Sequence, residues 1–167
     1  MIVCCADAFV ENYVGGAELT TEAIINSSFM PIGRINSHQI TPTILQQFSN
    51  RHWVFGNFAN LSEESMMFCV KNLNYSVVEY DYKFCKFRSI EKHISNEHSC
   101  ECEKTRHGKI VSIFLSHAKN VWFMSHKQRE IYIERFPFLN NNRTKVLSSL
   151  FSTEVLDHFE NLEEKAR

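Results

Sequence analysis

Short apolar runs alternate with segments of helical periodicity along the chain, and this alternation limits the fold more than any other feature. The opening run, MIVCCADA over 1–8, is apolar on both faces, which is typical of a strand buried inside a parallel sheet. Similar runs predict strands over 32–38, 52–58, 75–82, 120–124 and 144–148. Strands that alternate with helices form a parallel sheet covered on both faces.

Helix starts between these runs carry the expected cap residues. Thr41 precedes Pro42, Ser62 precedes an acidic first turn, and Ser125 lies three residues before Gln128 in a capping-box spacing. A further helix is expected over 16–27, with an inward face formed by Leu19, Ala23 and Ile24. Together the elements predict an α/β fold, a single Rossmann-like domain with a sheet of about six strands.

Composition excludes several classes of protein. The 167 residues are 44% hydrophobic and 13% aromatic, which is enough for a packed core and argues against disorder. A net charge of -1 is not the basic signature of a nucleic-acid-binding protein. The first residues lack a basic leader, and no apolar stretch reaches the ~18 residues of a transmembrane segment. We expect a cytoplasmic protein, free or at a membrane surface, with reduced cysteines.

Ligands of parallel α/β sheets bind at the carboxyl ends of the strands, so four loops are candidates: 9–16, 57–62, 80–108 and 125–128. The first contains Gly15 and Gly16 before a helix, where free N–H groups could hold an anion. This is neither a G-x-G-x-x-G motif nor a Walker sequence with its lysine. A plain strand-to-helix turn is the alternative for the two glycines, and a helix cap is the alternative for a phosphate-binding Ser125.

The stretch 83–108 is expected to be irregular, and it concentrates thiols and imidazoles. Cys85, Cys100 and Cys102 together with His93 provide the four ligands of a closed tetrahedral zinc site, with His98 as the next candidate for the imidazole. Such a metal would give this polar loop the order that packing cannot supply. The alternative is a set of free cysteines in a surface loop. The other cysteines, Cys4, Cys5 and Cys69, are expected in the core.

The same stretch carries more basic than acidic residues. A solvated surface is the simpler interpretation, and attraction of an anionic acceptor or lipid head group is the alternative. The basic residues are Lys83, Lys86, Arg88, Lys92, Lys104, Arg106 and Lys109.

Several segments, taken in order, resemble one known family. They are GGAE at 15–18, VFGNFANLS at 54–62, VVEYDYKFC at 77–85, the strand-serine-helix segment NVWFMSHKQREIYIERFP, and TKVLSSLFS. In this order they resemble the N-terminal, acceptor-side domain of GT-B fold glycosyltransferases of the family 4 type. The resemblance covers residues 1 to about 152 and implies transfer of a sugar from a nucleotide sugar to a glycan or lipid-linked acceptor.

The resemblance also implies roles for individual residues. Asp81 matches the aspartate of a catalytic His-Asp pair, and Tyr80 stands where the family has the histidine, which accepts a proton far more readily than a phenol. The residues implied at the donor diphosphate and cleft are Gly15, Gly16, Ala17, Asn57 and Ser125. The family needs no metal or other cofactor for its chemistry, so a zinc ion would be structural.

The family's donor-binding domain, with its E-x7-E motif, has no counterpart in residues 1–152. Residues 153–167 are therefore expected to form a helical tail or linker toward a donor domain, and the chain alone is expected to be inactive. Three arrangements stay open: a subunit of a split enzyme with a donor-domain partner chain, an excised or truncated domain, or a degenerate remnant. The competing class is a non-catalytic, zinc-stabilised α/β module that binds a partner.

Overall fold

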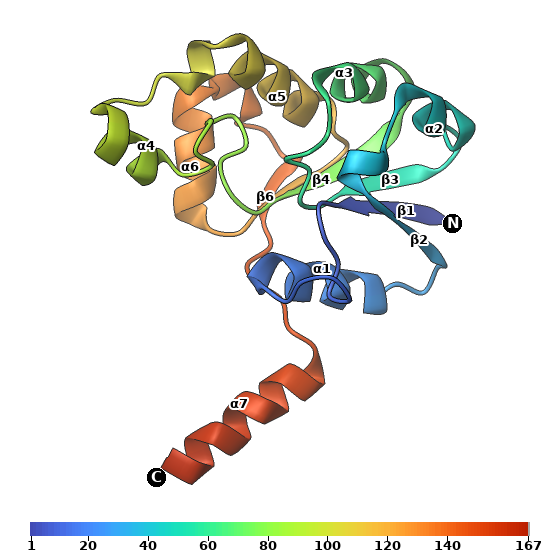
Figure 1. The fold of residues 1–167 in the computed structure, drawn as a ribbon, viewed down its shortest axis with the longest axis vertical. Helices are drawn as coiled ribbons and strands as arrows, with labels where there is room; N and C mark the ends of the chain where they lie inside the picture. Colours follow the sequence, from blue (N-terminus) through green and yellow to red (C-terminus); the bar gives the residue numbers. More distant parts are fainter. Residues whose placement is uncertain (167) are drawn as a thin grey trace.

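The computed structural model describes residues 1–166, with side chains through Leu162. A six-stranded, all-parallel sheet forms the centre, in the order β2-β1-β3-β4-β5-β6 (Figure 1). The strands are β1 (Ile2–Ala6), β2 (Ile32–Asn36), β3 (His52–Phe55), β4 (Asn74–Glu79), β5 (Val121–Phe123) and β6 (Thr144–Val146). The predicted α/β, Rossmann-like class is confirmed, although the strands are shorter than the apolar runs.

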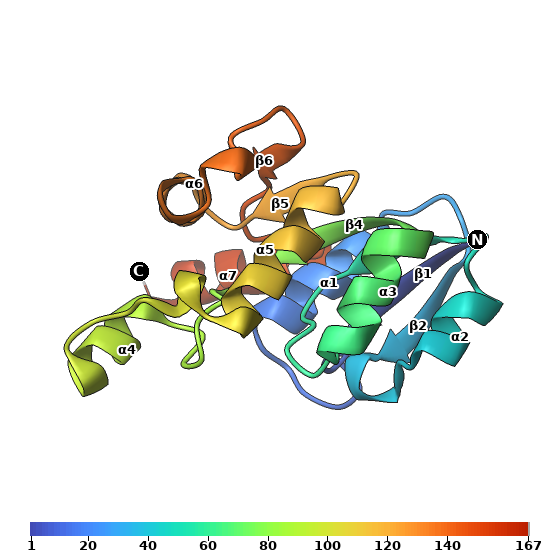
Figure 2. The same cartoon turned by 90° about the horizontal axis from the view of Figure 1, so that it is seen from above.

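Helices cover both faces of the sheet, unequally. The helix α1 lies on one face, and α2, α3 and α5 lie on the other (Figures 1 and 2). The α-helices are α1 (Gly16–Asn26), α2 (Pro42–Gln47), α3 (Glu63–Asn72), α4 (Ile90–Glu97), α5 (Arg106–His117), α6 (His126–Arg135) and α7 (Thr153–Ala166), and the 3-10 turns are η1 (Ser37–Gln39), η2 (Cys102–Lys104) and η3 (Pro137–Leu139).

Aromatic side chains dominate the core between the sheet and α5. Phe55 and Tyr75 project from neighbouring strands onto Phe114, with ring centroids 5.3 Å and 4.8 Å from it. The Tyr75 hydroxyl donates to the Phe114 carbonyl oxygen at 2.6 Å, so the one polar atom of this cluster is paired. The predicted core cysteines are also confirmed: Cys4, Cys5 and Cys69 are buried.

The inward face of α1 differs from the predicted one. Glu18 and Thr21 are buried, whereas Leu19, Ala23 and Ile24 are only half-buried. The reason is a polar contact that the hydrophobic pattern does not reveal, since the Thr21 hydroxyl lies 2.8 Å from the hydroxyl of Tyr80 at the end of β4. A satisfied hydroxyl can be buried at little cost, so α1 turns this side to the sheet.

The segment 83–108 is more ordered than predicted. It contains α4, η2 and the first turn of α5, which begins at Arg106 and so inside the stretch expected to be irregular. Ser89 caps α4 by accepting from the Lys92 N–H, and Thr105 caps α5 by accepting from the Gly108 N–H. The expectation of an irregular loop was therefore wrong for 90–97 and 102–108.

The chain reverses its winding direction between β1 and β3. The strand after β1 lies on one side of it, and β3 and all later strands lie on the other. The carboxyl ends of β1 and β3 therefore flank the topological switch point, which is where ligands bind in open α/β sheets. Asp7 follows β1, and Gly56 and Asn57 follow β3.

The tail forms the predicted helix, α7, which extends away from the sheet (Figure 1). Before it, the Leu150 backbone pairs with the Thr20 hydroxyl at 3.2 Å and 3.3 Å, which fixes the linker on α1. The apolar residues of α7 point to solvent, with Phe159 55% exposed. Arg167, the last residue of the predicted tail, lies outside the described residues. Through Ala166, no helix of this chain combines the length and the apolarity of a membrane-spanning segment.

Candidate functional site

Three thiols and one imidazole converge between α4 and η2. The ligand atoms of Cys85, His93, Cys100 and Cys102 all lie within 4.8 Å of one another, and all four residues are buried. His93 Nδ1 lies 3.3 Å from Cys85 Sγ and 3.4 Å from Cys102 Sγ, and the sulfur atoms of Cys85 and Cys100 are 3.8 Å apart. These four residues are called the metal centre below, because they could hold a metal ion.

The spacing of these atoms fits a tetrahedral ion. With a metal–sulfur bond of about 2.3 Å and a metal–nitrogen bond of about 2.0 Å, the tetrahedral edges are about 3.8 Å between sulfurs and about 3.5 Å between sulfur and nitrogen. The two sulfur–nitrogen distances and the one sulfur–sulfur distance given above fall within a few tenths of an ångström of these values. The other three distances are at most 4.8 Å, so the four side chains can close around an ion with movements of about 1 Å.

A second layer of contacts orients the ligands. The other ring nitrogen of His93, Nε2, lies 3.1 Å from Glu97 Oε2, and Lys86 Nζ pairs with the same carboxylate at 2.6 Å. A carboxylate on the distal nitrogen fixes the imidazole so that Nδ1 faces the metal. From α6, Arg135 donates to the Cys100 carbonyl oxygen at 2.9 Å, which ties the centre to the sheet domain.

Burial makes the thiols poor anions unless a cation is present. Burial, together with the adjacent Cys100 and Cys102, raises the pKa of Cys85 to about 12, against the lowering effect of the Phe87 backbone N–H. A divalent cation supplies the charge that lets such thiols bind as thiolates, so metal binding releases protons.

The other candidate imidazole, His98, and the nearby His107 both lie outside the metal centre. His98 ends α4 in the left-handed conformation, with φ 64°, and is exposed. His107 Nε2 lies 3.0 Å from the Lys83 carbonyl oxygen. The prediction that His93 is the imidazole ligand therefore agrees with the geometry.

A second group of polar residues gathers where β1, β3 and β4 end. We call it the carboxyl-edge cluster, and its members are Asp7, Asn57, Glu79, Asp81, Lys83 and Arg88. They lie at the carboxyl ends of β1, β3 and β4 or in the loops that follow these strands. The family resemblance named Asn57 and Asp81, and Lys83 and Arg88 were named only among the basic residues of 83–108.

Arg88 and Lys83 hold the Asp81 carboxylate. Arg88 Nε donates to Asp81 Oδ2 at 2.7 Å, and Lys83 Nζ donates to Oδ1 at 3.0 Å. The Arg88 guanidinium also donates to Asn57 Oδ1 at 2.8 Å, so it joins the ends of β3 and β4. Each oxygen of Asp81 accepts a hydrogen bond from a cationic side chain. In this arrangement Asp81 is therefore not available as a general base.

Asp7 connects the end of β1 to this cluster. Its carboxylate accepts the N–H groups of Ala59 and Asn60, each at 3.1 Å, and also the Ser37 hydroxyl. The Arg88 guanidinium lies 3.9 Å from Asp7 Oδ2. One aspartate thus fixes the loop that carries Asn57.

Two members of the cluster, Glu79 and Lys83, form a buried ion pair. Lys83 Nζ lies 3.4 Å from Glu79 Oε1, and the two side chains are 2% and 0% exposed. Burial raises the pKa of Glu79 to about 7, although Lys83 opposes the shift. Lys83 Nζ also stands 4.9 Å from the centre of the Phe58 ring, a cation–π contact.

Tyr80 lies beside the cluster, with its hydroxyl engaged by Thr21. Burial raises the pKa of Tyr80 above its ordinary value. The phenol therefore stays neutral at physiological pH, and its hydroxyl acts only as a hydrogen-bond donor or acceptor.

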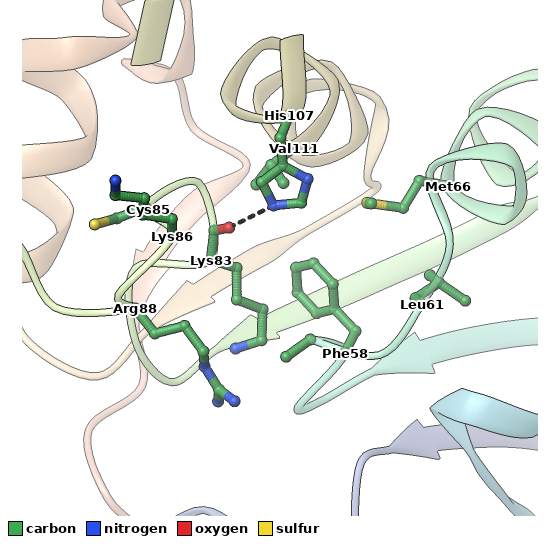
Figure 3. A pocket seen from close by; sticks show the side chains of 10 residues that line it. Phe58, Leu61, Met66, Lys83, Cys85, Lys86, Arg88, His107 and Val111 are labelled. Carbon is green, nitrogen blue, oxygen red and sulfur yellow. Dashed lines mark hydrogen bonds between the residues drawn. The ribbon is translucent and has the colours of Figure 1, made fainter. Parts of the chain in front are cut away.

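A pocket of about 140 Å³ opens between the loops that follow β3 and β4 (Figure 3). Apolar side chains of Phe58, Leu61, Met66 and Val111 form one part of its wall, and Lys83, Arg88 and His107 contribute polar groups. It also borders Cys85, so the pocket, the metal centre and the carboxyl-edge cluster are adjacent.

The glycine loop begins α1 without a side-chain cap. Gly15 is the N-cap in an extended conformation, with φ −146°, and provides no oxygen to the first-turn N–H groups of Gly16 and Ala17. A Cβ at Gly16 would meet no atom within 4 Å, so packing does not require glycine there. The Glu18 carboxylate lies near Gly15, with Oε2 2.8 Å from the position of a Cβ.

Ser125 acts as a helix cap. It accepts the Gln128 N–H at 3.1 Å, while the Gln128 side chain accepts from Met124 rather than from Ser125 itself. The Gln128 amide group then donates to the carbonyl oxygens of Glu79 and Asp81, at 3.0 Å and 2.8 Å. The geometry supports the interpretation of Ser125 as a helix cap rather than as a phosphate-binding serine.

The excess of basic residues in 83–108 is largely neutralised by pairing. Lys86 pairs with Glu97, and Lys104 pairs with Glu101. Lys83 is buried rather than solvated.

Comparisons with protein-family models, with curated proteins and with solved structures found no match to this chain.

Proposed function

We propose that this chain is the acceptor-side domain of a glycosyltransferase, which transfers a sugar from a nucleotide sugar together with a donor-binding domain. The observation that carries the proposal is the carboxyl-edge cluster near the switch point of the sheet, with a pocket beside it between the loops that follow β3 and β4. Carboxylate, amide and guanidinium groups with an aromatic neighbour are a suitable set for binding hydroxyl groups of a sugar.

In this proposal, residues of three loops line the cleft. The free N–H groups at Gly15, Gly16 and Ala17 face the donor diphosphate and stabilise the charge that develops on it. Asp81, held by Arg88 and Lys83, accepts hydrogen bonds from the reacting sugar, and Tyr80 takes the place of the family's histidine. Asn57 orients the Arg88 side chain. The open space around Gly16 supports a role in binding, because the fold itself does not need a glycine there.

We further propose that the metal centre holds a structural Zn²⁺ ion. Three thiolates and one imidazole are the ligand set that zinc prefers in closed, four-coordinate sites. With four protein ligands no coordination position is left for substrate, so the ion orders residues 85–104 and takes no part in the chemistry.

The test supplies the missing half of the cleft. The zinc-loaded domain is mixed with, or fused after Arg167 to, a donor-binding domain of the same family type, and release of nucleoside diphosphate is measured across UDP and GDP sugars. We expect transfer only when both halves are present. Gly16→Val and Asp81→Asn should lower kcat/KM at least about tenfold. Cys69→Ala, a buried change outside the cleft, should leave it unchanged. Equal rates for all three variants would count against the proposed cleft.

The second candidate is a non-catalytic interaction module, and one observation favours it. The tail helix α7 presents Leu156, Phe159 and Leu162 to solvent, each about half exposed. An apolar row of this kind needs a covering surface. If no nucleotide sugar reacts in any combination, while the tail still binds another protein, this second function is the better account.

A further inference from the structure

One short turn belongs to both the metal centre and the carboxyl-edge cluster. Residues 82–88 form two successive hydrogen-bonded turns. The Cys85 N–H donates to the Tyr82 carbonyl oxygen at 2.8 Å, and the Arg88 N–H donates to the Cys85 carbonyl oxygen at 2.9 Å. The Tyr82 N–H donates to the Arg88 carbonyl at 3.3 Å. A displacement of Cys85 must therefore displace Arg88.

Arg88 is also held in an unfavourable backbone conformation. Its φ is 57°, in the left-handed region, which is unfavourable for a residue other than glycine. Packing does not hold it there, because the Arg88 side chain is 41% exposed. What remains are its bonds to Asp81 and Asn57 on one side and the turn through Cys85 on the other.

The residue after Arg88 extends the connection to a second ligand. The Ser89 hydroxyl accepts the Lys92 N–H and so starts α4, the helix that carries His93. Arg88 thus lies between two ligands of the metal centre, three residues after Cys85 and five before His93. An ion held by both Cys85 and His93 would therefore tie the two ends of this segment together.

We propose that occupancy of the metal centre sets the position of Arg88 and so assembles the carboxyl-edge cluster. With the ion bound, the turn is rigid and the guanidinium joins the ends of β3 and β4. Without the ion, the turn relaxes out of the left-handed conformation and Arg88 leaves Asp81. Arg88 is therefore a positioning residue. Its effect on a substrate rests on the proposed sugar transfer, whereas its coupling to the metal rests only on the proposed zinc site.

The first experiment observes Arg88 directly. The guanidinium N–H signals, Nε–H and Nη–H, are recorded by nuclear magnetic resonance on the zinc-loaded chain before and after chelation, with Arg88→Lys used for assignment. We expect the Arg88 signal to disappear on chelation while that of Arg34, which pairs with Glu11 and Glu22 away from the metal centre, stays. An Arg88 signal unchanged after zinc removal overturns the proposal.

The second experiment decides the case in which chelation also abolishes the Arg34 signal by unfolding the domain. Coupling between two sites is reciprocal, so breaking the Arg88 contact must weaken zinc binding. Asp81→Asn, which alters no metal ligand, should lower zinc affinity about fivefold or more in competition with a chromophoric chelator. The control Glu63→Gln removes an equal charge from an ion pair with Arg106 and should bind zinc like the unmodified chain. Equal affinity of Asp81→Asn and the unmodified chain overturns the proposal.

Neither experiment uses a sugar or measures transfer. A chain that fails to transfer any sugar, yet loses zinc affinity on Asp81→Asn, refutes the proposed function and retains the coupling. The reverse outcome, transfer without coupling, refutes only this inference.

Discussion

The backbone carbonyl of Cys102 packs directly against Gly108, and its oxygen occupies the place where a Cβ at that position would stand. Gly108 is the third residue of α5, so a glycine there is not required by the helix. It is required because η2, which carries a metal ligand, lies against the start of α5. The close approach thus joins the metal centre to a core helix.

Gly108→Ala should therefore destabilise the protein. The new methyl group must displace η2, and an overpacked site of this kind costs about 1–3 kcal/mol of the free energy of unfolding. Denaturant unfolding of the zinc-loaded protein measures the cost. Gly16→Ala is the matched control, because it has open space and should change stability by less than about 0.5 kcal/mol. Equal effects of the two substitutions would mean that η2 is not packed as described.

Loss of one ligand should abolish stable metal binding. Cys102→Ser leaves three of four ligands and opens the buried site, so purified protein should contain much less than one zinc ion per chain. Metal analysis after dialysis against a weak chelator measures the content. Cys69→Ser alters an equally buried cysteine outside the metal centre and should keep its zinc. Zinc retained by both variants would place the ion elsewhere.

The buried Glu79 should make stability depend on pH in one direction. Its folded-state pKa is raised from 4.5 to about 7 by burial, with Lys83 lowering it and Asp81 raising it, so the folded state binds the proton more tightly than the unfolded chain. This contribution is fully present below about pH 4.5 and is lost as the pH rises through about 7. Glu79→Gln lacks this titration.

The difference in the free energy of unfolding between Glu79→Gln and the unmodified protein isolates this effect from all other groups. It should increase in favour of the variant between about pH 5 and about pH 8. Urea unfolding at several pH values measures it. A difference that stays constant over this range, or that falls, would mean that Glu79 is ionised throughout.

The apolar residues of α7 should contribute little to the stability of this chain. Leu156 and Leu162 are each 48% exposed, so Leu156→Ser and Leu162→Ser should change the free energy of unfolding by less than about 0.5 kcal/mol. Leu115→Ala, at a site 1% exposed in α5, should cost about 2–5 kcal/mol. A large loss from the α7 substitutions would show that the helix folds back onto the domain.

The alternation of apolar runs was sufficient to predict the sheet, because a strand that is buried on both faces has apolar residues at consecutive positions. Cys4 and Cys5 of β1, which are both buried, are an example. The convergence of Cys85, His93, Cys100 and Cys102 was predictable as well, since three thiols and an imidazole in one short stretch match the ligand set of a zinc site. Residue types alone indicate which atoms could bind a metal. They did not predict that α4 and η2 form around these atoms.

The carboxyl-edge cluster was largely hidden from sequence. Asp7, Lys83 and Arg88 come from loops brought together by strand order, and no local pattern distinguishes them from solvated charges. Asp7 offered one signal, as an acid directly after a buried strand that precedes a candidate loop. The inward face of α1 was missed for a related reason: burial of Thr21 depends on Tyr80, which lies 59 residues away in sequence.

The most direct measurement of the central claim is X-ray absorption at the zinc edge of the purified chain. We predict one zinc ion with three sulfur neighbours at about 2.3 Å and one nitrogen neighbour at about 2.0–2.1 Å, from Cys85, Cys100, Cys102 and His93. A spectrum with only nitrogen and oxygen neighbours, or protein free of zinc after expression in zinc-supplemented medium, would contradict the account.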